Sequence, residues 1–148
     1  HTLGGMIGCG AKSAALAERL AANLERIRGQ AAALPVRPRV YFEEWDEPPI
    51  AAISWVAEII EIARGDNCFP ALARESLGKN RIIRDPLEVP RRRPDLILGS
   101  WCGKKFNSRS VAARPGWESV PAVANGELHG IDGIEAIHRI IVGWGLKK

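Results

Sequence analysis

Apolar residues in the first quarter of the chain recur at helical spacing. Leu16, Leu20, Leu24 and Ile27 fall on one stripe of a segment rich in Ala, Glu and Arg, all good helix formers. This pattern predicts a long helix over residues 12–33, which two prolines end shortly afterwards. At ~1.5 Å per residue the helix would be about 33 Å long, the width of a small domain.

Two later segments have the pattern of strands. Arg39–Trp45 gathers Val, Tyr and Phe and then becomes charged, as a strand does where it leaves the core. Asp95–Trp101 contains an uninterrupted apolar run, which is typical of a parallel strand buried on both faces. We therefore predict two core strands separated by about fifty residues, a distance that leaves room for helical crossovers.

Helical and turn patterns lie between and after these strands. Pro48-Pro49 is expected to open a helix that runs to about Ala63, because Pro is tolerated in a first turn. Its buried face would comprise Ile50, Ile53, Val56, Ala57 and Ile60. A short helix is predicted over 85–92, capped by Asp85 with Pro86 in its first turn. A short helix or loop is predicted over 109–117, and a tight turn at Asn125-Gly126. The last predicted element is an amphipathic helix over Ile134–Trp144 with Ile137 and Ile141 on its apolar stripe. This alternation predicts an α/β domain with a mainly parallel sheet.

Composition restricts the class of protein further. The chain has 148 residues, of which 46% are hydrophobic, so it can bury a core as one domain. The net charge of +4 is mild, and the one arginine run, 91–93, is interpreted as a solvated helix end because it has no interleaved aromatic residues. No apolar stretch is long enough for a membrane span, and the first residues lack a signal-peptide pattern. We therefore expect a mature, processed or partial chain without nucleic-acid binding.

The two predicted strands end alike. Each finishes in a Trp among polar residues, over 43–46 (EEWD) in one and 100–105 (SWCGKK) in the other. Ligands of open parallel sheets bind outside the carboxyl ends of the strands, and Trp offers a large flat surface with an indole N–H. The pattern therefore predicts a binding edge for a large, partly planar ligand. In the alternative interpretation each Trp caps the core and the charged residues form surface ion pairs; these are Glu43, Glu44, Lys104 and Lys105.

Catalytic and metal chemistry find little support. Cys102 with His129 or His138 could supply a nucleophile and a base, but no third residue is available to orient the base. The three Cys and three His residues show none of the spacings of a zinc site. We therefore expect a protein that is not an enzyme, with no catalytic residue, no metal and no tightly bound cofactor.

Five segments occur in an order that resembles a known family. They are RVYFEEWDEPPI, GDNCFPALARESLGKNRII, DPLEV, RPDLILGSWCGKKF and VAARPGW. Together they resemble the C-terminal lobe of periplasmic substrate-binding proteins of the vitamin B12 and iron-siderophore ABC-importer class, in particular the cobalamin-binding group. The resemblance covers roughly residues 2–129 and 134–144. It implies a protein of two α/β lobes joined by one rigid long helix, with the ligand in the cleft between them.

The resemblance also implies a division of the chain. Residues 1–11 would be a remnant of the N-terminal lobe, 12–35 the long connecting helix, and 36–148 a Rossmann-like three-layer C-terminal lobe with a mainly parallel sheet. On this resemblance the first lobe would be absent from the chain, and the cleft would have one wall. A Pro-containing segment that the family carries after the position of His129 is shortened here, so part of that wall is expected to be missing.

Site residues carry over by position. The resemblance places Trp45 and Trp101 at cleft-facing strand ends and makes Glu44, Lys104 and Lys105 candidates for polar ligand contacts. The family docks its permease through an acidic side chain on each lobe, which meets arginines of the permease. The candidate for that role is Glu88, although Leu87 lies equally close to the expected position and Asp85 is better explained as a helix cap.

The implied function is solute import. We expect this lobe to help capture a corrinoid such as vitamin B12 and deliver it to an ABC-importer permease, with a ferric siderophore or haem as alternative ligands. A non-transport α/β interaction domain, dimerising through the long helix, is the alternative outside transport. The implied location is the periplasm, an oxidising compartment in which Cys68 and Cys102 are candidates for a disulfide.

Overall fold

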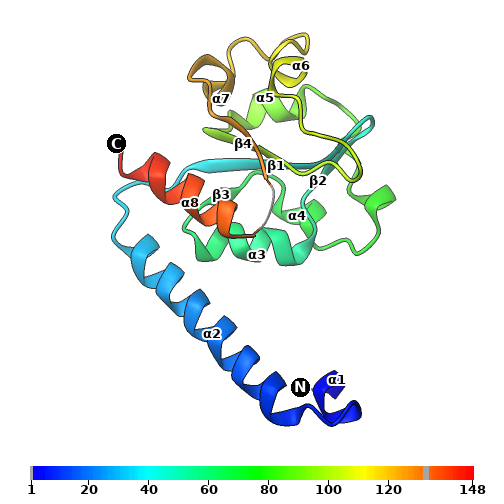
Figure 1. The fold of residues 1–148 in the computed structure, drawn as a ribbon. Coiled ribbons are helices and arrows are strands. Elements are labelled where there is room, and N and C mark those ends of the chain that lie inside the picture. The colour runs from blue at the N-terminus through cyan, green and yellow to red at the C-terminus, as the bar shows by residue number, and fades with distance from the viewer. Residues whose placement is uncertain (1, 132–133) are drawn as a thin grey trace.

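The computed structural model describes residues 2–131 and 134–148, which form a mixed α/β lobe and a long projecting helix (Figure 1). The strand order in the sheet is β2-β1-β4-β5, and β3 pairs with the start of β1. Strand β1 runs parallel to β3 and β4, β4 runs parallel to β5, and only β2 is antiparallel to its neighbour. The bounds are β1 Arg39–Asp46, β2 Pro49–Ala51, β3 Asp66–Asn67, β4 Leu96–Gly99 and β5 Leu128–Gly130. The predicted α/β class with a mainly parallel sheet is confirmed.

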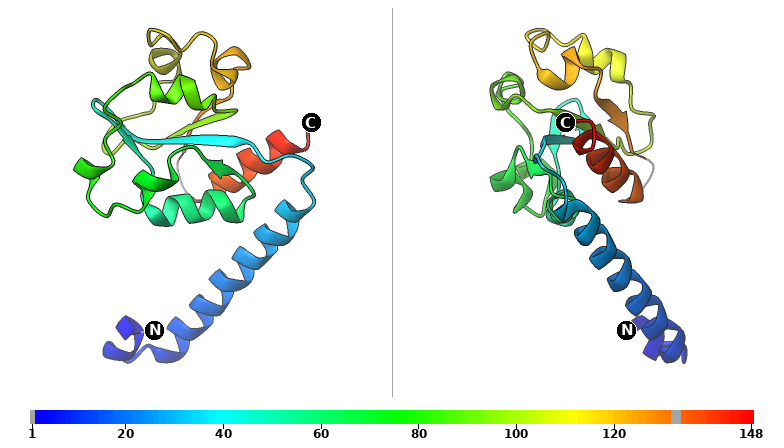
Figure 2. Two further views of the ribbon diagram at one scale, coloured as in Figure 1. Left: turned by 180° about the vertical axis from the view of Figure 1, so that it is seen from behind. Right: turned by 90° about the vertical axis from the view of Figure 1, so that its left-hand side faces the viewer.

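Helices cover both faces of this sheet (Figures 1 and 2). Helices α3 and α8 pack on one face, and the short helices α5, α6 and α7 lie over the other. Their bounds are α3 Ser54–Ile62, α4 Pro70–Ala73, the 3-10 turn η1 Gly78–Asn80, α5 Glu88–Arg92, α6 Ser108–Ala112, α7 Pro121–Ala124 and α8 Ile134–Gly145. The result is the three-layer arrangement expected for such a lobe.

Alternation along β1 divides the core between the two faces. Val40 and Phe42 belong to the cluster under α3 and α8, whereas Tyr41 belongs to the cluster under α5 to α7. Successive side chains of a strand point to opposite faces, so a strand that is apolar at every position must be covered by helices on both faces of the sheet. All four residues of β4 are buried for the same reason.

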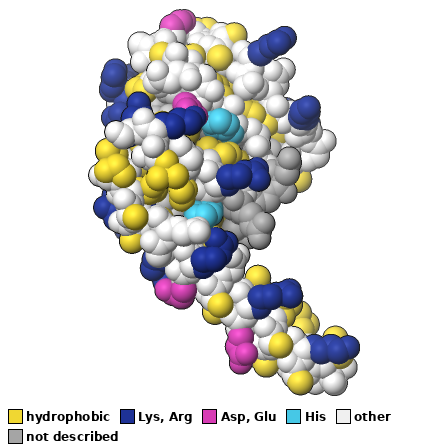
Figure 3. All heavy atoms as spheres, turned by 60° about the vertical axis from the view of Figure 1, so that its left-hand side comes forward, with side chains coloured by type: hydrophobic (Ala, Val, Ile, Leu, Met, Phe, Trp, Pro, Cys, Tyr) yellow, Lys and Arg dark blue, Asp and Glu magenta, His cyan; other side chains and the backbone are white. Residues whose placement is uncertain are grey.

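The long helix stands away from the lobe. Helix α2 spans Gly10–Ala32, preceded by the short α1 over Thr2–Met6, and projects from the lobe in Figures 2 and 3. Ile27 and Ala31, near its end, are buried, whereas Leu16, Leu20 and Leu24 are exposed. The predicted long helix is confirmed, and its apolar stripe lies largely outside the core of the lobe. Among the described residues, no helix is both long and apolar enough to cross a membrane.

The prediction that Pro48-Pro49 opens a helix is wrong. Pro49 begins β2, which folds back along β1 so that Ile50 lies opposite Trp45. Helix α3 starts only at Ser54, although its buried face of Val56, Ala57 and Ile60 is as predicted. A Pro pair suits a turn as well as a first helical turn, and pairing with the edge of β1 decides between them.

One capping prediction needs correction, and one turn prediction is confirmed. Asp85 lies in the turn before α5, where its Oδ1 accepts a hydrogen bond from the Leu87 N–H (3.0 Å), and the helix begins at Glu88. Asn125-Gly126 forms the predicted tight turn, which links the end of α7 to β5, and β5 runs parallel to β4. Gly126 has φ +70°, the left-handed conformation that commonly ends a helix. Ile137, Ile141 and Trp144 of α8 are buried as predicted, while the side chain of Ile134 lies outside the described ones.

Candidate functional site

The structure brings the two polar strand ends together. Strands β1 and β4 are parallel neighbours in which Glu43 lies opposite Gly99, so Trp45 and Trp101 emerge at one carboxyl edge. Gly99 is needed there, because a Cβ at this position would lie 2.0 Å from the ring of Phe106. That ring in turn packs edge-on against Trp101, with their centroids 5.0 Å apart. The edge is therefore built from close packing around one strand end.

Lys104 connects the two indoles. Its Nζ lies 4.5 Å from the ring centroid of Trp45 and 5.0 Å from that of Trp101, within the range of cation–π attraction. The same atom is 2.6 Å from Oδ1 of Asp46. Burial by itself raises the pKa of Asp46, but the contact with Lys104, a backbone hydrogen bond and the charges of Lys104 and Arg114 together lower that pKa overall. The edge thus holds an ammonium group between two aromatic surfaces and a carboxylate.

The two indoles differ in how firmly they are held. Trp101 is only 8% exposed, and its Nε1 donates to Oε1 of the buried Glu43 (3.0 Å). Trp45 is half-buried, and its Nε1 donates to the carbonyl of Glu47 in the turn that follows (2.9 Å). Trp101 is therefore a fixed wall, and Trp45 presents the more accessible aromatic surface.

Glu43 organises the edge from beneath, a role that the sequence analysis missed. Its carboxylate is 0% exposed and accepts bonds from Tyr41 Oη (2.7 Å), Trp101 Nε1, and Arg114 Nη1 and Nη2 (2.6 and 3.0 Å). Burial, together with the charge of Glu43, raises the pKa of Tyr41 well above its usual value. The alternation of Tyr41 and Glu43 on one strand face was a usable signal for this cluster. Nothing in the local pattern pointed to Arg114.

Glu44 faces the opposite way and is already paired. Its Oε2 lies 2.5 Å from Nη1 of Arg81, and its Oε1 accepts from Nη2 at 3.1 Å. Arg81 is buried and also donates to the carbonyl of Ala51 (2.6 Å). The carboxylate of Glu44 is therefore engaged by the protein itself, and its role as a ligand contact stays a prediction.

Two hollows of about 390 Å³ flank the Lys104–Asp46 pair. One lies beside Trp101 at the ends of β4 and β5, where Lys104 and Lys105 contribute to its lining. Lys105 is exposed and makes no ion pair among the described residues. The other is lined by Asp46, Arg114, Trp117 and three prolines. Four of the predicted contact residues thus meet at one edge: Trp45, Trp101, Lys104 and Lys105.

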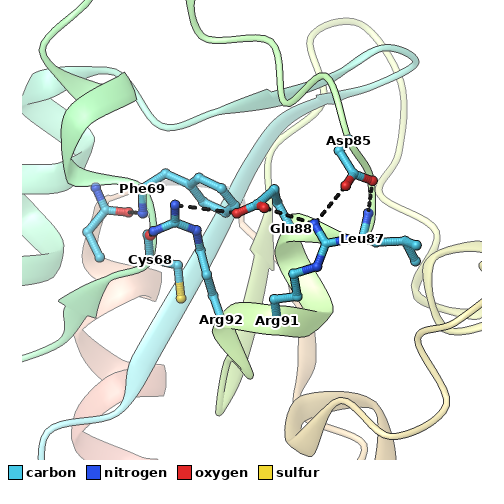
Figure 4. Close-up of polar contacts among 8 residues, drawn as sticks. Cys68, Phe69, Asp85, Leu87, Glu88, Arg91 and Arg92 are labelled. Atoms are coloured by element: carbon cyan, nitrogen blue, oxygen red, sulfur yellow. Dashed lines mark hydrogen bonds and ion pairs between the residues drawn. The ribbon is translucent and has the colours of Figure 1, made fainter.

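Glu88 lies elsewhere, on α5, whose buried Val89 belongs to the same core cluster as Tyr41. Figure 4 shows Glu88 beside Arg91 and Arg92. Its carboxylate lies 2.9 Å from Arg91 Nη1 and 3.6 Å from Arg92 Nη2. Leu87, the alternative at this position, is exposed. The docking role of Glu88 stays a prediction, with the added fact that the acid is flanked by two arginines of its own helix.

The predicted disulfide is wrong, because Cys68 and Cys102 are both free thiols. The Cys68 N–H donates to the carbonyl of Val40 at the start of β1 (2.9 Å), whereas Cys102 follows the carboxyl end of β4. Since β1 and β4 run parallel, the two thiols lie toward opposite ends of the sheet. Burial raises the pKa of the Cys68 thiol to about 12.

The catalytic alternative gains no support from geometry. His129 Nε2 lies 2.9 Å from Oε2 of Glu127, and Cys102 is an exposed residue of the loop after β4. His138 lies on α8, where burial lowers its pKa. In the part of the chain that the structure describes, no three His, Cys, Asp or Glu residues gather as metal ligands would.

Comparisons with known proteins point to one family. A family model described as "Periplasmic binding protein" matches residues 1–134. Similar solved structures include an ABC transporter substrate-binding protein from Listeria monocytogenes EGD-e (TM-score 0.72, 14% identity, 95% of this chain and 60% of that one). A second is the periplasmic heme-binding protein RhuT from Roseiflexus sp. RS-1 (TM-score 0.72, 18% identity, 97% of this chain and 57% of that one). A third is a periplasmic binding protein from Veillonella parvula (TM-score 0.74, 20% identity, 95% of this chain and 54% of that one).

These likenesses at low identity concern the fold. The chain spans 54 to 60% of the length of the three structures, so it corresponds to a part of each. A comparison with curated protein sequences found no significant match.

Proposed function

This chain belongs to the periplasmic binding protein family, and from that membership we propose that it supplies the C-terminal lobe of the solute-binding component of an ABC importer. In this role the lobe works outside the cytoplasmic membrane, as one wall of a cleft that a second lobe completes. It binds and releases a ligand without transforming it. The exposed stripe of α2 fits this proposal, because a connecting helix also contacts the other lobe.

The observation that carries the proposal is the aromatic edge of the sheet. Trp45 and Trp101 flank the Lys104 ammonium group beside a hollow at the carboxyl ends of parallel strands, the usual ligand position in open α/β sheets. A corrinoid matches this chemistry, because it offers a flat ring surrounded by amide groups. The indoles would cover its apolar face, and Lys104 and Lys105 would bind amide oxygens.

Haem is the second candidate, and two observations favour it. A similar structure carries a heme-binding protein's name, and the Lys105 ammonium group is unpaired among the described residues. Haem resembles a corrinoid in its flat ring but carries carboxylates, which Lys104 and Lys105 would pair with directly. A ferric siderophore fits less well, because a larger cationic cluster would be expected around an anionic iron complex.

A titration of the two-lobed parent protein tests the proposal. Cyanocobalamin, haemin and ferric enterobactin would each be titrated by calorimetry into wild type, Trp101→Phe and Trp144→Phe. We expect one macrocycle to bind with micromolar or tighter affinity, and Trp101→Phe to weaken it about tenfold because aromatic area and the anchoring N–H are lost. Trp144→Phe lies on α8, away from the edge, and is the matched control. Absence of binding by all three ligands would overturn the assignment of this edge.

Delivery completes the proposed function. The loaded protein would dock on a membrane permease through its exposed α5 surface, where Glu88 is the acidic candidate. Docking through charged groups at a surface is weakened by salt, because exposed charges are screened beyond about 8 Å at physiological ionic strength. The affinity for the permease should therefore fall as salt is raised.

A further inference from the structure

The hollow lined by Asp46, called the Asp46 hollow below, adjoins the hollow beside Trp101. Asp46 lines the first and Lys104 lines the second, and Nζ of Lys104 lies 2.6 Å from Oδ1 of Asp46. The proposed ligand contacts of Lys104 and Lys105 belong to the second hollow. The Asp46 hollow, of about 390 Å³, is therefore a further space that a ligand on the aromatic edge can enter.

Much of the wall of the Asp46 hollow is apolar and rigid. Trp117 is part of it, and its ring is held from two sides: Tyr41 packs edge-on with the centroids 6.1 Å apart, and the Arg114 guanidinium lies 4.8 Å from the ring centroid. A proline ring fixes the backbone φ, so a wall that contains prolines loses little conformational freedom when a ligand binds. The prolines of this wall are Pro49, Pro86 and Pro115.

The wall also carries hydrogen-bond donors that the protein does not fully use. Among the described residues the Arg114 side chain donates only to the carboxylate of Glu43, through two of the five N–H groups of a guanidinium. Nε1 of Trp117 is buried and has no hydrogen-bond partner in the part of the chain that the structure describes. A buried donor without an acceptor costs about 1–3 kcal/mol, so a ligand oxygen at this wall would be stabilising.

The charges at the Asp46 hollow disfavour an anionic group. The positive charge of Arg114 is balanced by the buried Glu43, and that of Lys104 by Asp46. Glu47 also lines the hollow, is exposed and makes no ion pair among the described residues. Three acids against two bases leave a formal charge of −1 on this group. A carboxylate placed here would therefore meet like charge, whereas an uncharged polar group would not.

We propose that the Asp46 hollow binds an uncharged amide group at the rim of the ligand and so selects an amide-bearing macrocycle over one that places a carboxylate there. The inference rests on the proposed function, because it concerns a further part of the same ligand site. An amide has both an acceptor and donors. Its oxygen accepts from Arg114, and its NH2 group donates to the carboxylate of Asp46. Asp46 and Glu47 are the residues that determine this specificity.

Derivatives of one ligand test this assignment. Calorimetry on the two-lobed parent would compare cyanocobalamin with its separated monocarboxylic acids, in each of which one peripheral amide is replaced by a carboxylate. The variants are Asp46→Asn, Glu47→Gln and the control Glu58→Gln, which removes one negative charge at an exposed position of α3. Glu47→Gln keeps the contact between Lys104 and Asp46, so it isolates the charge of the hollow from the support of Lys104. Thermal unfolding of each variant would show that the fold is retained.

In wild type we expect the isomer whose carboxylate enters the Asp46 hollow to bind about tenfold more weakly than cyanocobalamin, because like charges meet there. Asp46→Asn and Glu47→Gln should narrow this difference to about threefold, and the control should leave it unchanged. The inference is overturned if every isomer binds as cyanocobalamin does, or if neither variant narrows the difference more than the control. Binding of haemin or ferric enterobactin in place of cyanocobalamin would overturn it and leave the proposed function standing. Absence of binding by all of these ligands would instead overturn the proposed function.

Discussion

Glu43 and Glu44 are neighbours on β1, and each forms a bidentate ion pair with an arginine. The acid is the buried partner in one pair, and the arginine is the buried partner in the other. In the first, the acid is 0% exposed and the Arg114 side chain reaches the surface. In the second, the Arg81 side chain is 3% exposed and Glu44 is the more accessible partner, at 37%. Because adjacent residues of a strand point to opposite faces, the two acids enter different surroundings despite identical chemistry.

The difference shows what each pair does. Glu43 gathers Tyr41, Trp101 and Arg114 and so fixes the aromatic wall of the candidate site. The Glu44 carboxylate neutralises the buried guanidinium of Arg81, which also donates a hydrogen bond to the carbonyl of Ala51 in β2. One pair therefore supports the site, and the other supports the edge of the sheet.

The largest effect is expected from Glu43→Gln. The substitution leaves Arg114 without its charged partner and removes an acceptor from a fully buried cluster, so the free energy of unfolding should fall by about 3–5 kcal/mol. Urea unfolding followed by circular dichroism measures this. Glu58→Gln, at an exposed position of α3, is the control and should change stability by less than about 0.5 kcal/mol. A loss below about 1 kcal/mol would show that Glu43 does not organise the edge.

Glu44→Gln should have a smaller effect, a loss of about 1–3 kcal/mol. The amide oxygen can still accept one bond from Arg81, and water reaches this side of the pair because Glu44 is partly exposed. The same urea experiment gives the comparison directly. If Glu44→Gln destabilises the protein more than Glu43→Gln, burial of the acid is not what distinguishes the two pairs.

Alkaline pH should lower the free energy of unfolding through the cluster around Glu43 and not through the Glu44–Arg81 pair. The pKa of Tyr41 is raised well above 10.0, so above this pH the unfolded chain releases a proton that the folded chain retains. The contribution of Tyr41 to the free energy of unfolding is therefore complete below pH 10, and it falls by about 1.4 kcal/mol per pH unit above it. Cys68, raised from 9.0 to about 12, adds a similar loss that begins near pH 9.

The measurement compares unfolding between pH 8 and 11 in Cys68→Ala and in Cys68→Ala/Tyr41→Phe. Removing both groups should leave stability nearly independent of pH over the interval from 10 to 11. An unchanged slope in the double variant would mean that Tyr41 does not titrate differently in the folded and unfolded states.

Lys104→Met should have the smallest effect on stability, at most about 1 kcal/mol, because the Lys104 side chain of its ion pair with Asp46 is 43% exposed and solvent screens the pair. The lowered pKa of Asp46 means that this contribution is present above pH 3.8 and is lost as the pH falls through the folded-state pKa. Wild type and variant should therefore converge in stability at acid pH. Ligand affinity, measured by calorimetry, should respond more than stability does.

Much of the fold could be predicted because its signals are local. The apolar runs of β1 and β4 and the periodic stripes of α2 and α8 depend on residues close in sequence, and parallel pairing then placed Trp45 and Trp101 at one edge. The errors arose where one local pattern suits two structures. Pro48-Pro49 can open a helix or begin a strand, and here Pro49 begins β2.

Short-range patterns and the order of segments along the chain were enough to indicate the α/β class, the long helix, the two Trp-bearing strand ends and the resemblance to a periplasmic binding lobe. Which of the two acids is buried depends on the three-dimensional packing, because Glu43 pairs with Arg114 at a separation of 71 residues and Glu44 with Arg81 at 37. The packing also separated Cys68 from Cys102 and enclosed Glu88 between arginines. Such partnerships depend on the packing of distant segments, and no local pattern specifies them.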